Sequence, residues 1–255
     1  MVELNLQNKV AVITGGSRGI GAACVRMLVE AGAKVVFNYQ KDRQAADQLV
    51  RSLGPDVCYS VQADLSSAES ARPFIAAAVE RFGRVDAVVG NHGIWPSGDI
   101  PIDQMSDEQW RKTMAINLDS IFGLVKHSVA QMKKQKSGGS VVLVSSTAGQ
   151  RGEAFHADYA ASKGAIISMV KGLGTELARD QIRVNCVAPG WVHTDMSAPA
   201  LNDPKIRDWA FSTIPLGRAG TPEEIAAPIL FLCTEHAGFI TGEIFNVNGG
   251  AVLVG

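Results

Sequence analysis

A tyrosine and a lysine lie four residues apart in the segment Tyr159-Ala160-Ala161-Ser162-Lys163. If this segment is helical, the phenol and the ammonium group share one face of the helix. The apolar run 164–170 predicts that the pair lies at the start of a long, packed helix. A fixed cation beside a phenol lowers the pKa of that phenol, so Tyr159 would exchange a proton near neutral pH. The same spacing also arises by chance on a solvated helix surface, and the rest of the chain decides between these interpretations.

The composition of the 255-residue chain is that of a globular protein, with 46% apolar and 19% charged residues. A net charge of −1 provides no basic field, so neither nucleic acid nor a membrane is expected as a partner. No apolar run approaches the roughly 20 residues of a membrane span, and no signal peptide is apparent in residues 1–6. The four cysteines are far apart, which favours buried free thiols over disulfides or metal ligands. These features predict a cytoplasmic protein without a metal site.

A glycine-rich turn follows the first predicted strand, residues 9–13, and precedes a helical pattern over residues 22–30. The turn reads Thr14-Gly15-Gly16-Ser17-Arg18-Gly19-Ile20-Gly21. Glycines let the backbone approach a pyrophosphate, and the start of a helix supplies free N–H groups. The strand before the turn and the helix after it favour a phosphate cradle over a plain tight turn.

The end of the second predicted strand, residues 34–38, indicates which dinucleotide is bound. NAD-binding folds place an acidic residue there, about 20 positions after the glycine turn, to bind the ribose 2′-hydroxyl. Asn38 and Tyr39 stand at this point, without a carboxylate. The basic residues that can hold a 2′-phosphate are Arg18, Lys41 and Arg43. NADP(H) is therefore favoured over NAD(H). Asp42 is the rival ribose ligand, but it is better placed as the N-cap of a helix over residues 43–53.

Polar residues follow the third and fourth predicted strands. Asp64 comes after the strand 57–61, and either accepts a hydrogen bond from the adenine amino group or caps a helix over residues 67–82. The strand 84–89 leads into Asn91-His92-Gly93, at the carboxyl end of a parallel strand, where such sheets bind ligands. His92 invites a catalytic interpretation, but we favour a structural or cofactor-lining role.

Two more polar residues are expected near Tyr159. Asn117 lies inside one long predicted helix, residues 107–134, although an asparagine amide competes with helix backbone bonds. It is either functional or a satisfied buried amide. Ser146 ends the strand 140–144 and precedes Tyr159 by 13 residues. A single loop between them can bring both hydroxyls to one cleft.

The rest of the chain continues an alternation of strands and helices. A sixth strand, residues 184–188, ends at Pro189-Gly190, and the irregular, apolar segment 191–220 predicts a substrate lid. Thr221 begins a capped helix, and residues 244–247 form the last strand. The alternation predicts a single α/β domain over residues 1–255. Its Rossmann-type, doubly wound parallel sheet would have about seven strands and helices on both faces.

These motifs together resemble those of the short-chain dehydrogenase/reductase family, in the family's order and spacing over nearly the whole chain. They are Thr14-Gly15, Gly19-Ile20-Gly21, Asp64-Leu65, Asn91, Gly93, Asn117, Ser146, Tyr159, Lys163 and Pro189-Gly190. The glycine spacing and the chain length resemble the compact branch of the family. The resemblance implies an oxidoreductase that transfers a hydride between a nicotinamide dinucleotide and a carbonyl or secondary alcohol, assembled as a homotetramer.

The resemblance also implies a role for each residue. Tyr159 exchanges the proton of the substrate oxygen, Lys163 lowers the Tyr159 pKa and bonds the nicotinamide ribose, and Ser146 stabilises charge on the substrate oxygen. Asn117 holds a water that connects Lys163 to solvent, and Thr194 contacts the nicotinamide carboxamide. The implied cofactor-binding residues are Gly15, Ser17, Arg18, Gly19, Ile20, Gly21, Asn38, Tyr39, Asp64, Leu65, Asn91, Gly93, Tyr159, Lys163, Pro189, Gly190, Val192 and Thr194.

Within the family, residues 16–21 and 242–250 resemble the 3-oxoacyl-(acyl-carrier-protein) reductases, which implies reduction of a 3-oxoacyl thioester or a similar ketone. The alternatives are an alcohol, polyol or sugar dehydrogenase working oxidatively, and a dinucleotide-binding regulator without turnover. Lys133, Lys134 and Lys136 could receive an acidic carrier protein, but Asp180-Gln181 stand where this subgroup has an arginine. A second departure is His92, where the family usually has alanine.

Overall fold

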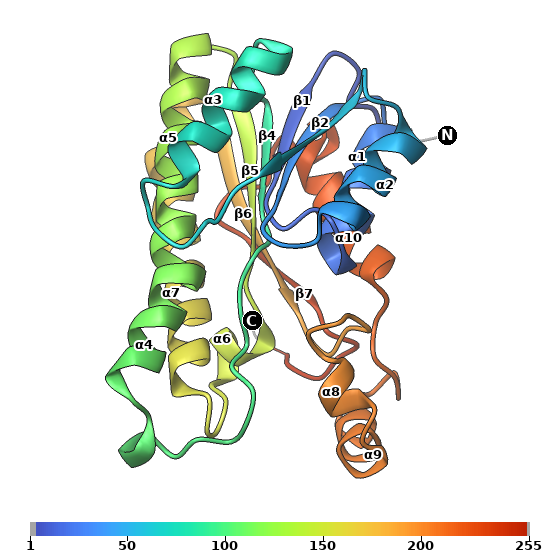
Figure 1. Cartoon of the computed structure of the whole chain (residues 1–255). Helices are drawn as coiled ribbons and strands as arrows, with labels where there is room; N and C mark the ends of the chain where they lie inside the picture. Colours follow the sequence, from blue (N-terminus) through green and yellow to red (C-terminus); the bar gives the residue numbers. More distant parts are fainter. Residues whose placement is uncertain (1–3, 254–255) are drawn as a thin grey trace.

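Seven strands form one parallel sheet in the computed structural model, which describes residues 4–253 (Figure 1). Within that range the strands are β1 (Val10–Ile13), β2 (Lys34–Tyr39), β3 (Cys58–Gln62), β4 (Ala87–Gly90), β5 (Gly139–Val144), β6 (Ile182–Pro189) and β7 (Ile244–Val247). Their order is β3-β2-β1-β4-β5-β6-β7, and every pairing is parallel. The predicted sheet is therefore confirmed.

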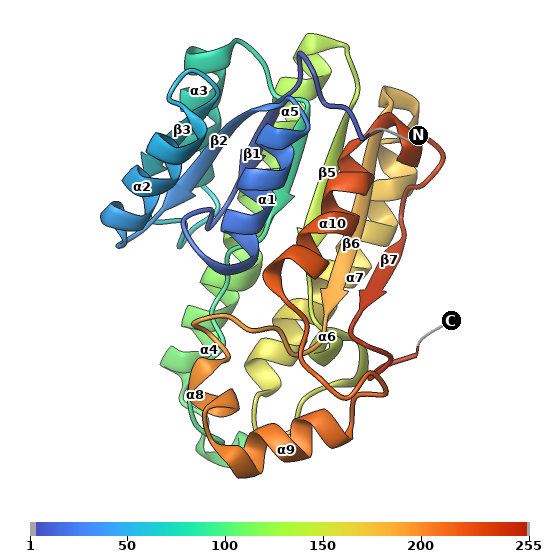
Figure 2. The same cartoon turned by 90° about the vertical axis from the view of Figure 1, so that its right-hand side faces the viewer.

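Helices cover both faces because strand side chains alternate between two cores. In β1, Ala11 and Ile13 belong to one core and Val12 to the other. The helices of the first core are α1 (Gly19–Glu30), α2 (Arg43–Leu53) and α10 (Pro222–Cys233), and those of the second are α3 (Ala71–Phe82), α5 (Ser120–Gln135) and α7 (Ala157–Glu176). Figure 1 shows these layers on either side of the sheet, and Figure 2 shows α1 and α10 in front of it. The doubly wound fold class is confirmed.

The chain reverses its direction across the sheet between β1 and β4. From β1 it moves outward to β2 and β3, and β4 then returns to the other side of β1. Doubly wound sheets bind ligands beyond the carboxyl ends of the strands at such a reversal. The glycine-rich turn follows β1 and Asn91-His92-Gly93 follows β4, so the two turns meet at this point.

The helix predicted over residues 107–134 is interrupted, which corrects that prediction. Helix α4 (Asp107–Met114) runs into a π-helical segment, η2 (Ala115–Asp119), and then into α5. Asn117 lies at the centre of η2, where its side chain is held by the loop after β4. Such π-bulges frequently mark functional sites.

The segment 191–220 was predicted to be irregular, but it contains α8 (Ala198–Leu201) and α9 (Pro204–Ser212). Asp203 caps α9, and Pro204 occupies its first turn, where a missing N–H is harmless. A bridge between Val192 and Gly220 joins the two ends of the segment, and the His193 N–H donates to the Gly220 carbonyl at 2.9 Å. The segment is therefore a folded insertion whose two ends are joined by backbone hydrogen bonds.

Two predicted N-caps are confirmed, whereas α1 and α3 start at other residues than predicted; α1, expected over residues 22–30, begins at Gly19. Asp42 accepts a hydrogen bond from the Ala45 N–H as the N-cap of α2, and Thr221 forms a capping box at the start of α10. Helix α3, expected from residue 67, begins at Ala71, so Asp64 does not cap it. The remaining short helices are η1 (Ile102–Gln104), α6 (Thr147–Arg151), η3 (Ala178–Asp180) and η4 (Glu235–Ala237).

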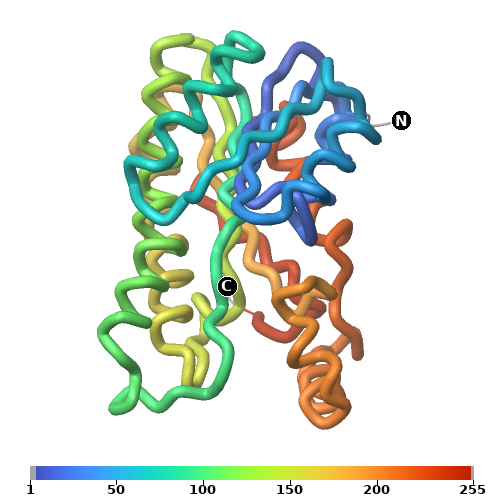
Figure 3. The backbone as a smooth tube through the Cα atoms, viewed as in Figure 1, coloured from blue at the N-terminus to red at the C-terminus, as the bar shows by residue number. Residues whose placement is uncertain are grey.

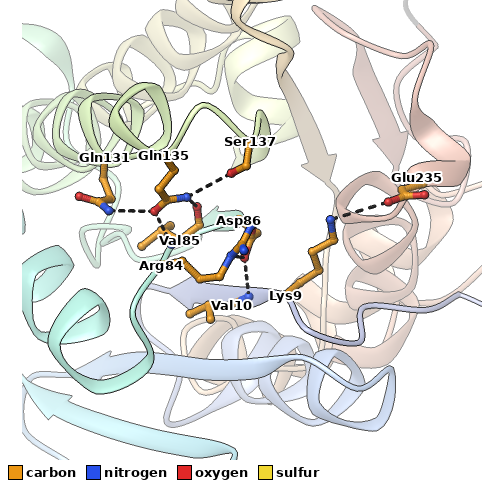
Figure 4. A network of polar contacts seen from close by, with 9 residues as sticks. All are labelled: Lys9, Val10, Arg84, Val85, Asp86, Gln131, Gln135, Ser137 and Glu235. Atoms are coloured by element: carbon orange, nitrogen blue, oxygen red, sulfur yellow. Dashed lines mark hydrogen bonds and ion pairs between the residues drawn. The ribbon is translucent and has the colours of Figure 1, made fainter.

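A polar network secures the starts of β1 and β4, at the end of the sheet opposite the glycine turn (Figure 4). The buried Asp86 carboxylate accepts hydrogen bonds from the Val10 N–H at 2.9 Å and from Arg84 Nε at 2.8 Å. Gln135, at the end of α5, bonds both backbone groups of Val85 at 2.8 Å. Because these contacts satisfy backbone groups at the strand starts, this end of the sheet is structural.

All four cysteines are buried free thiols, as predicted. Burial raises the pKa of Cys58, Cys186 and Cys233 to about 12, which makes them poor nucleophiles and metal ligands. Between residues 4 and 253, no helix is both long enough and apolar enough to cross a membrane.

Candidate active site

The glycine-rich turn is packed too closely at several positions to admit a side chain. Gly15 has φ +63°, a conformation that L side chains rarely adopt. A Cβ at Gly21 would lie 2.1 Å from the Gly15 carbonyl oxygen, so only glycine fits there. The turn therefore offers bare backbone at the start of α1, and this cradle fits a pyrophosphate group.

Two asparagines hold the shape of this turn. Asn38 Oδ1 accepts a hydrogen bond from the Gly15 N–H at 2.8 Å, and its Nδ2 donates to the Ala63 carbonyl at 2.9 Å. Asn91 Nδ2 donates to the Thr14 carbonyl at 3.0 Å, and its N–H donates to Thr14 Oγ1 at 2.9 Å. Both residues were predicted as cofactor contacts, and both brace the turn from β2 and β4.

The predicted cofactor-binding residues differ in solvent exposure. Those buried are Gly21, Asn38, Tyr39, Leu65, Pro189 and Val192. Those partly exposed are Gly15, Ser17, Gly19, Ile20, Asn91, Gly93, Gly190 and Thr194, whereas Arg18 and Asp64 are exposed. The buried side chains serve as scaffold, and Tyr39 packs in the first core.

The exposed Arg18 connects the turn to the segment 191–220. Its Nη1 lies 3.3 Å from the Asp195 carboxylate, and both side chains are about two-thirds exposed, at 67% and 71%. A Cβ at Gly19 would lie 3.3 Å from the Thr194 methyl group, so Thr194 sits directly on the turn. An exposed ion pair of this kind contributes only about 0–1 kcal/mol, so the Arg18 guanidinium can exchange partners.

Tyr159 and Lys163 lie in the first two turns of α7, as predicted. Lys163 is 4% exposed, and its Nζ donates to the Val144 carbonyl at 2.9 Å. The same Nζ is 5.9 Å from the centre of the Tyr159 ring. Ser146, two residues after β5, accepts a hydrogen bond from the Ala148 N–H as the N-cap of α6, and it is close enough to Tyr159 to lower the pKa of that phenol. The two hydroxyls predicted to share a cleft therefore lie on the same side of the sheet edge.

The pKa of Tyr159 moves in the direction opposite to the expected one. Burial raises the pKa of Tyr159 to about 12, although the nearby Ser146 hydroxyl opposes this effect. Burial also lowers the pKa of Lys163 to about 8. The expectation failed because desolvation outweighs charge proximity here, and because the ammonium group faces the Val144 carbonyl instead of the phenol.

Asn117 ties the loop after β4 to α7. Its Oδ1 accepts from the Ile94 N–H at 2.8 Å, and its Nδ2 donates to the Ile94 carbonyl at 2.9 Å and to Ser162 Oγ at 3.1 Å. A Cβ at Gly93 would lie 3.1 Å from Asn117 Oδ1 and 3.4 Å from Lys163 Nζ. The side chain of Asn117 is thus a satisfied buried amide that fixes the surroundings of Lys163.

His92 packs against the glycine-rich turn and is bonded to Ser120, the first residue after the π-helical segment. Its Nε2 lies 2.7 Å from Ser120 Oγ, which in turn donates to the Ile116 carbonyl at 2.6 Å. A Cβ at Gly15 would be 3.2 Å from His92 Cβ. Burial, reinforced by the positive charge of Lys163, lowers the pKa of His92 to about 4. The ring is therefore neutral at physiological pH, consistent with a structural role.

An aromatic and acidic cluster lies beside this centre. Trp95 Nε1 donates to Glu153 Oε1 at 3.1 Å, the Trp95 and His156 rings stack at 4.8 Å, and Trp191 meets Trp95 edge-on at 6.0 Å. Glu153 and His156 were missed, because the loop that carries them has no periodic pattern.

Comparison with known proteins agrees with this geometry. Residues 15–252 match the family described as enoyl-(acyl carrier protein) reductase. The 3-oxoacyl-(acyl-carrier-protein) reductase FabG of Vibrio cholerae is 38% identical over 98% of this chain and 100% of its own. The corresponding reductase of Synechocystis is 38% identical over 97% of this chain and 98% of its own.

Solved structures show the same likeness. A short-chain dehydrogenase/reductase of Brucella melitensis, described as a glucose/ribitol dehydrogenase, superposes with a TM-score of 0.90. It is 38% identical over 99% of this chain and 100% of its own. The protein gox2181 superposes with a TM-score of 0.92 at 34% identity, over 98% of this chain and 97% of its own.

The fold and the matches define an NAD(P)-dependent oxidoreductase that acts on CH–OH or keto groups. The chain belongs to the short-chain dehydrogenase/reductase family.

Proposed function

We propose that this protein is an NADP-dependent carbonyl reductase whose substrate is a 3-oxoacyl thioester or a similar ketone. The observation that carries the proposal is the meeting of Ser146, Tyr159 and the buried Lys163 at the sheet edge that also bears the glycine turn. An acid, a hydrogen-bond donor and a cation then surround one substrate oxygen.

The residues of this chain divide the work as follows. The glycine turn holds the pyrophosphate of the dinucleotide, and Thr194 and Lys163 hold its nicotinamide end. The bound cofactor supplies the hydride. Ser146 donates a hydrogen bond to the substrate oxygen, and Tyr159 gives that oxygen its proton. Lys163, whose Nζ is bonded to the Val144 carbonyl, places a positive charge 5.9 Å from the centre of the Tyr159 ring, and Asn117 keeps the surroundings of Lys163 in place through Ile94.

The pKa of Tyr159 favours the reductive direction. Because burial raises that pKa to about 12, the phenol keeps its proton at neutral pH and is ready to donate it. Oxidation of an alcohol needs the phenolate as a base, which is scarce at the same pH. At neutral pH this supports Tyr159 as the proton donor in ketone reduction, and the reverse oxidation of an alcohol through the same groups is expected to become faster as the pH rises.

The end of β2 supports a preference for NADP(H) over NAD(H). Asn38 stands where a ribose-binding carboxylate would be, and its amide is committed to Gly15 and Ala63. Arg18 is exposed at the edge of the turn and held only by the weak pair with Asp195. Its guanidinium can donate two parallel hydrogen bonds to the oxygens of a 2′-phosphate.

The substrate class rests on the relatives, several of which carry the name of 3-oxoacyl-(acyl-carrier-protein) reductases. A carrier-protein partner has weaker support, because Lys133 Nζ is ion-paired with Asp180 at 2.8 Å. That pair neutralises part of the basic surface an acidic partner would use.

The segment 191–220, hinged at the Val192–Gly220 bridge, is our candidate for a substrate lid. Assembly as a homotetramer stays a prediction.

The proposal is tested by following cofactor oxidation with acetoacetyl thioesters, simple ketones and cyclic ketones, each with NADPH and with NADH. Strong NADPH-dependent turnover of the thioester is the expected result. Turnover with NADH alone would refute the assignment of Arg18, and activity confined to non-thioester ketones would refute the substrate class.

A further inference from the structure

Three segments distant in sequence build one wall beside Tyr159. Trp95 comes from the loop after β4, Glu153 and His156 from the connection between α6 and α7, and Trp191 from the segment after β6. Figure 3 shows these parts of the chain extending beyond the same end of the sheet. Apart from Glu153, the wall is aromatic, so it offers an apolar surface with a single carboxylate.

Glu153 is held by one hydrogen bond and by one long contact with a histidine that is an ion pair only when the ring is protonated. Its side chain is 24% exposed, and its Oε1 accepts a hydrogen bond from the neutral indole of Trp95 at 3.1 Å. The His156 Nδ1 is 3.7 Å from that oxygen, longer than a hydrogen bond. The ring nitrogens of His156 face the carbonyls of Pro96 and Ala154 at 3.2 and 3.3 Å. Burial raises the pKa of the Glu153 carboxyl, and the hydrogen bond from Trp95 and the nearby charges of His156 and Arg151 only partly oppose this effect.

Glu153 lies in the short connection that leads directly into α7, where Tyr159 is the third residue. Glu153 lies six residues before Tyr159, and its negative charge contributes to raising the pKa of the Tyr159 hydroxyl. A substrate carbonyl that accepts the Tyr159 proton must lie next to that hydroxyl. In a 3-oxo acid the carboxyl group is only two bonds beyond the reacting carbon. A free carboxylate there would meet a like charge at the protein surface.

We propose that Glu153 determines substrate charge: the site accepts 3-oxoacyl groups whose carboxyl end is masked as an ester or thioester and rejects the free 3-oxo acid anions. This inference rests on the proposed ketone reductase function and defines its substrate class more closely. Two partly buried like charges several ångströms apart are expected to lower kcat/KM about tenfold relative to the neutral analogue.

The test compares acetoacetate with methyl acetoacetate, which share the reacting ketone and differ in charge. The wild type is expected to prefer the ester, mainly through KM. Glu153→Gln keeps an oxygen for the Trp95 indole and removes the charge, so its kcat/KM for acetoacetate should rise about tenfold while that for the ester changes less than about twofold. The control is Glu176→Gln, at the exposed far end of α7. It also removes one negative charge and should change kcat/KM for neither acetoacetate nor the ester.

A second variant separates charge from loop structure. Trp95→Phe loses the indole hydrogen bond but leaves the Glu153 carboxylate, so the preference for the ester should persist. Binding of 3-hydroxybutyrate and its methyl ester, followed by tryptophan fluorescence, should show the same order without turnover. An unchanged ester-to-acid ratio in Glu153→Gln would overturn the inference while the reductase function stands. Failure of the wild type to reduce either compound would overturn both.

Discussion

The substitution Lys163→Met should change how protein stability depends on pH. Lys163 is 4% exposed in the folded protein, where burial lowers its pKa from the ordinary 10.5 to about 8. Methionine has a similar length and carries no charge. Comparing the two proteins therefore isolates the proton on this one side chain.

The free energy of unfolding changes with pH because folded and unfolded chains bind different numbers of protons at Lys163. Below pH 8 the lysine is protonated in both the folded and the unfolded state, and the full cost of burying the charge is present. Between about pH 8 and 10.5 the unfolded chain keeps the proton and the folded protein has released it, so stability rises with pH. Each pKa unit is worth about 1.4 kcal/mol, so the difference between 10.5 and about 8 amounts to roughly 3 kcal/mol.

The assay is urea denaturation of both proteins at one protein concentration, from about pH 7 to about pH 10. The free energy of unfolding of the wild type, minus that of Lys163→Met, should increase by about 2–3 kcal/mol over this range. The cysteines and other groups titrate in both proteins, so their effects largely cancel. A difference that stays constant with pH would show that Lys163 keeps its ordinary pKa, and a difference that falls would show that folding raises that pKa; either result would contradict the prediction.

Two further substitutions test the cofactor side of the site. Arg18→Ala should weaken NADPH binding about tenfold in a fluorescence titration and leave NADH binding unchanged, because only NADPH has the 2′-phosphate; an equal loss for both would contradict this role. Gly21→Ala should abolish binding of both nucleotides, because its Cβ would lie 2.1 Å from the Gly15 carbonyl oxygen. Its control is Gly172→Ala, exposed in α7 with nothing within 4 Å, which should bind normally and gain about 0.5–1 kcal/mol in unfolding free energy. Normal binding by Gly21→Ala would refute the cradle.

The sheet and the sequence positions of the motifs could be predicted because they depend on local signals. Apolar runs followed by turn residues marked each strand, and the final strand over residues 244–247 was predicted with the bounds it has in the structure. The caps at Asp42 and Thr221 were equally readable, since a side chain and a backbone N–H three residues away suffice.

What failed depends on contacts between distant parts of the chain. Residues 115–119 contain no proline or glycine, and the π-helical break there arises with the bonds between Asn117 and Ile94. The rise in the pKa of Tyr159 comes from burial, which the four-residue spacing to Lys163 does not reveal. Helix α9 did have a signal, Asp203 before Pro204, although the segment 191–220 was predicted to be irregular.

The central claim, that Tyr159 supplies the proton during ketone reduction, is tested most directly with Tyr159→Phe. NADPH binding is first measured by fluorescence, and then kcat/KM is measured for an acetoacetyl thioester. The account predicts unchanged NADPH affinity and a loss of about 10²-fold or more in kcat/KM, the usual contribution of a general acid. Turnover within about threefold of the wild type would contradict the account, because a phenyl ring cannot donate that proton.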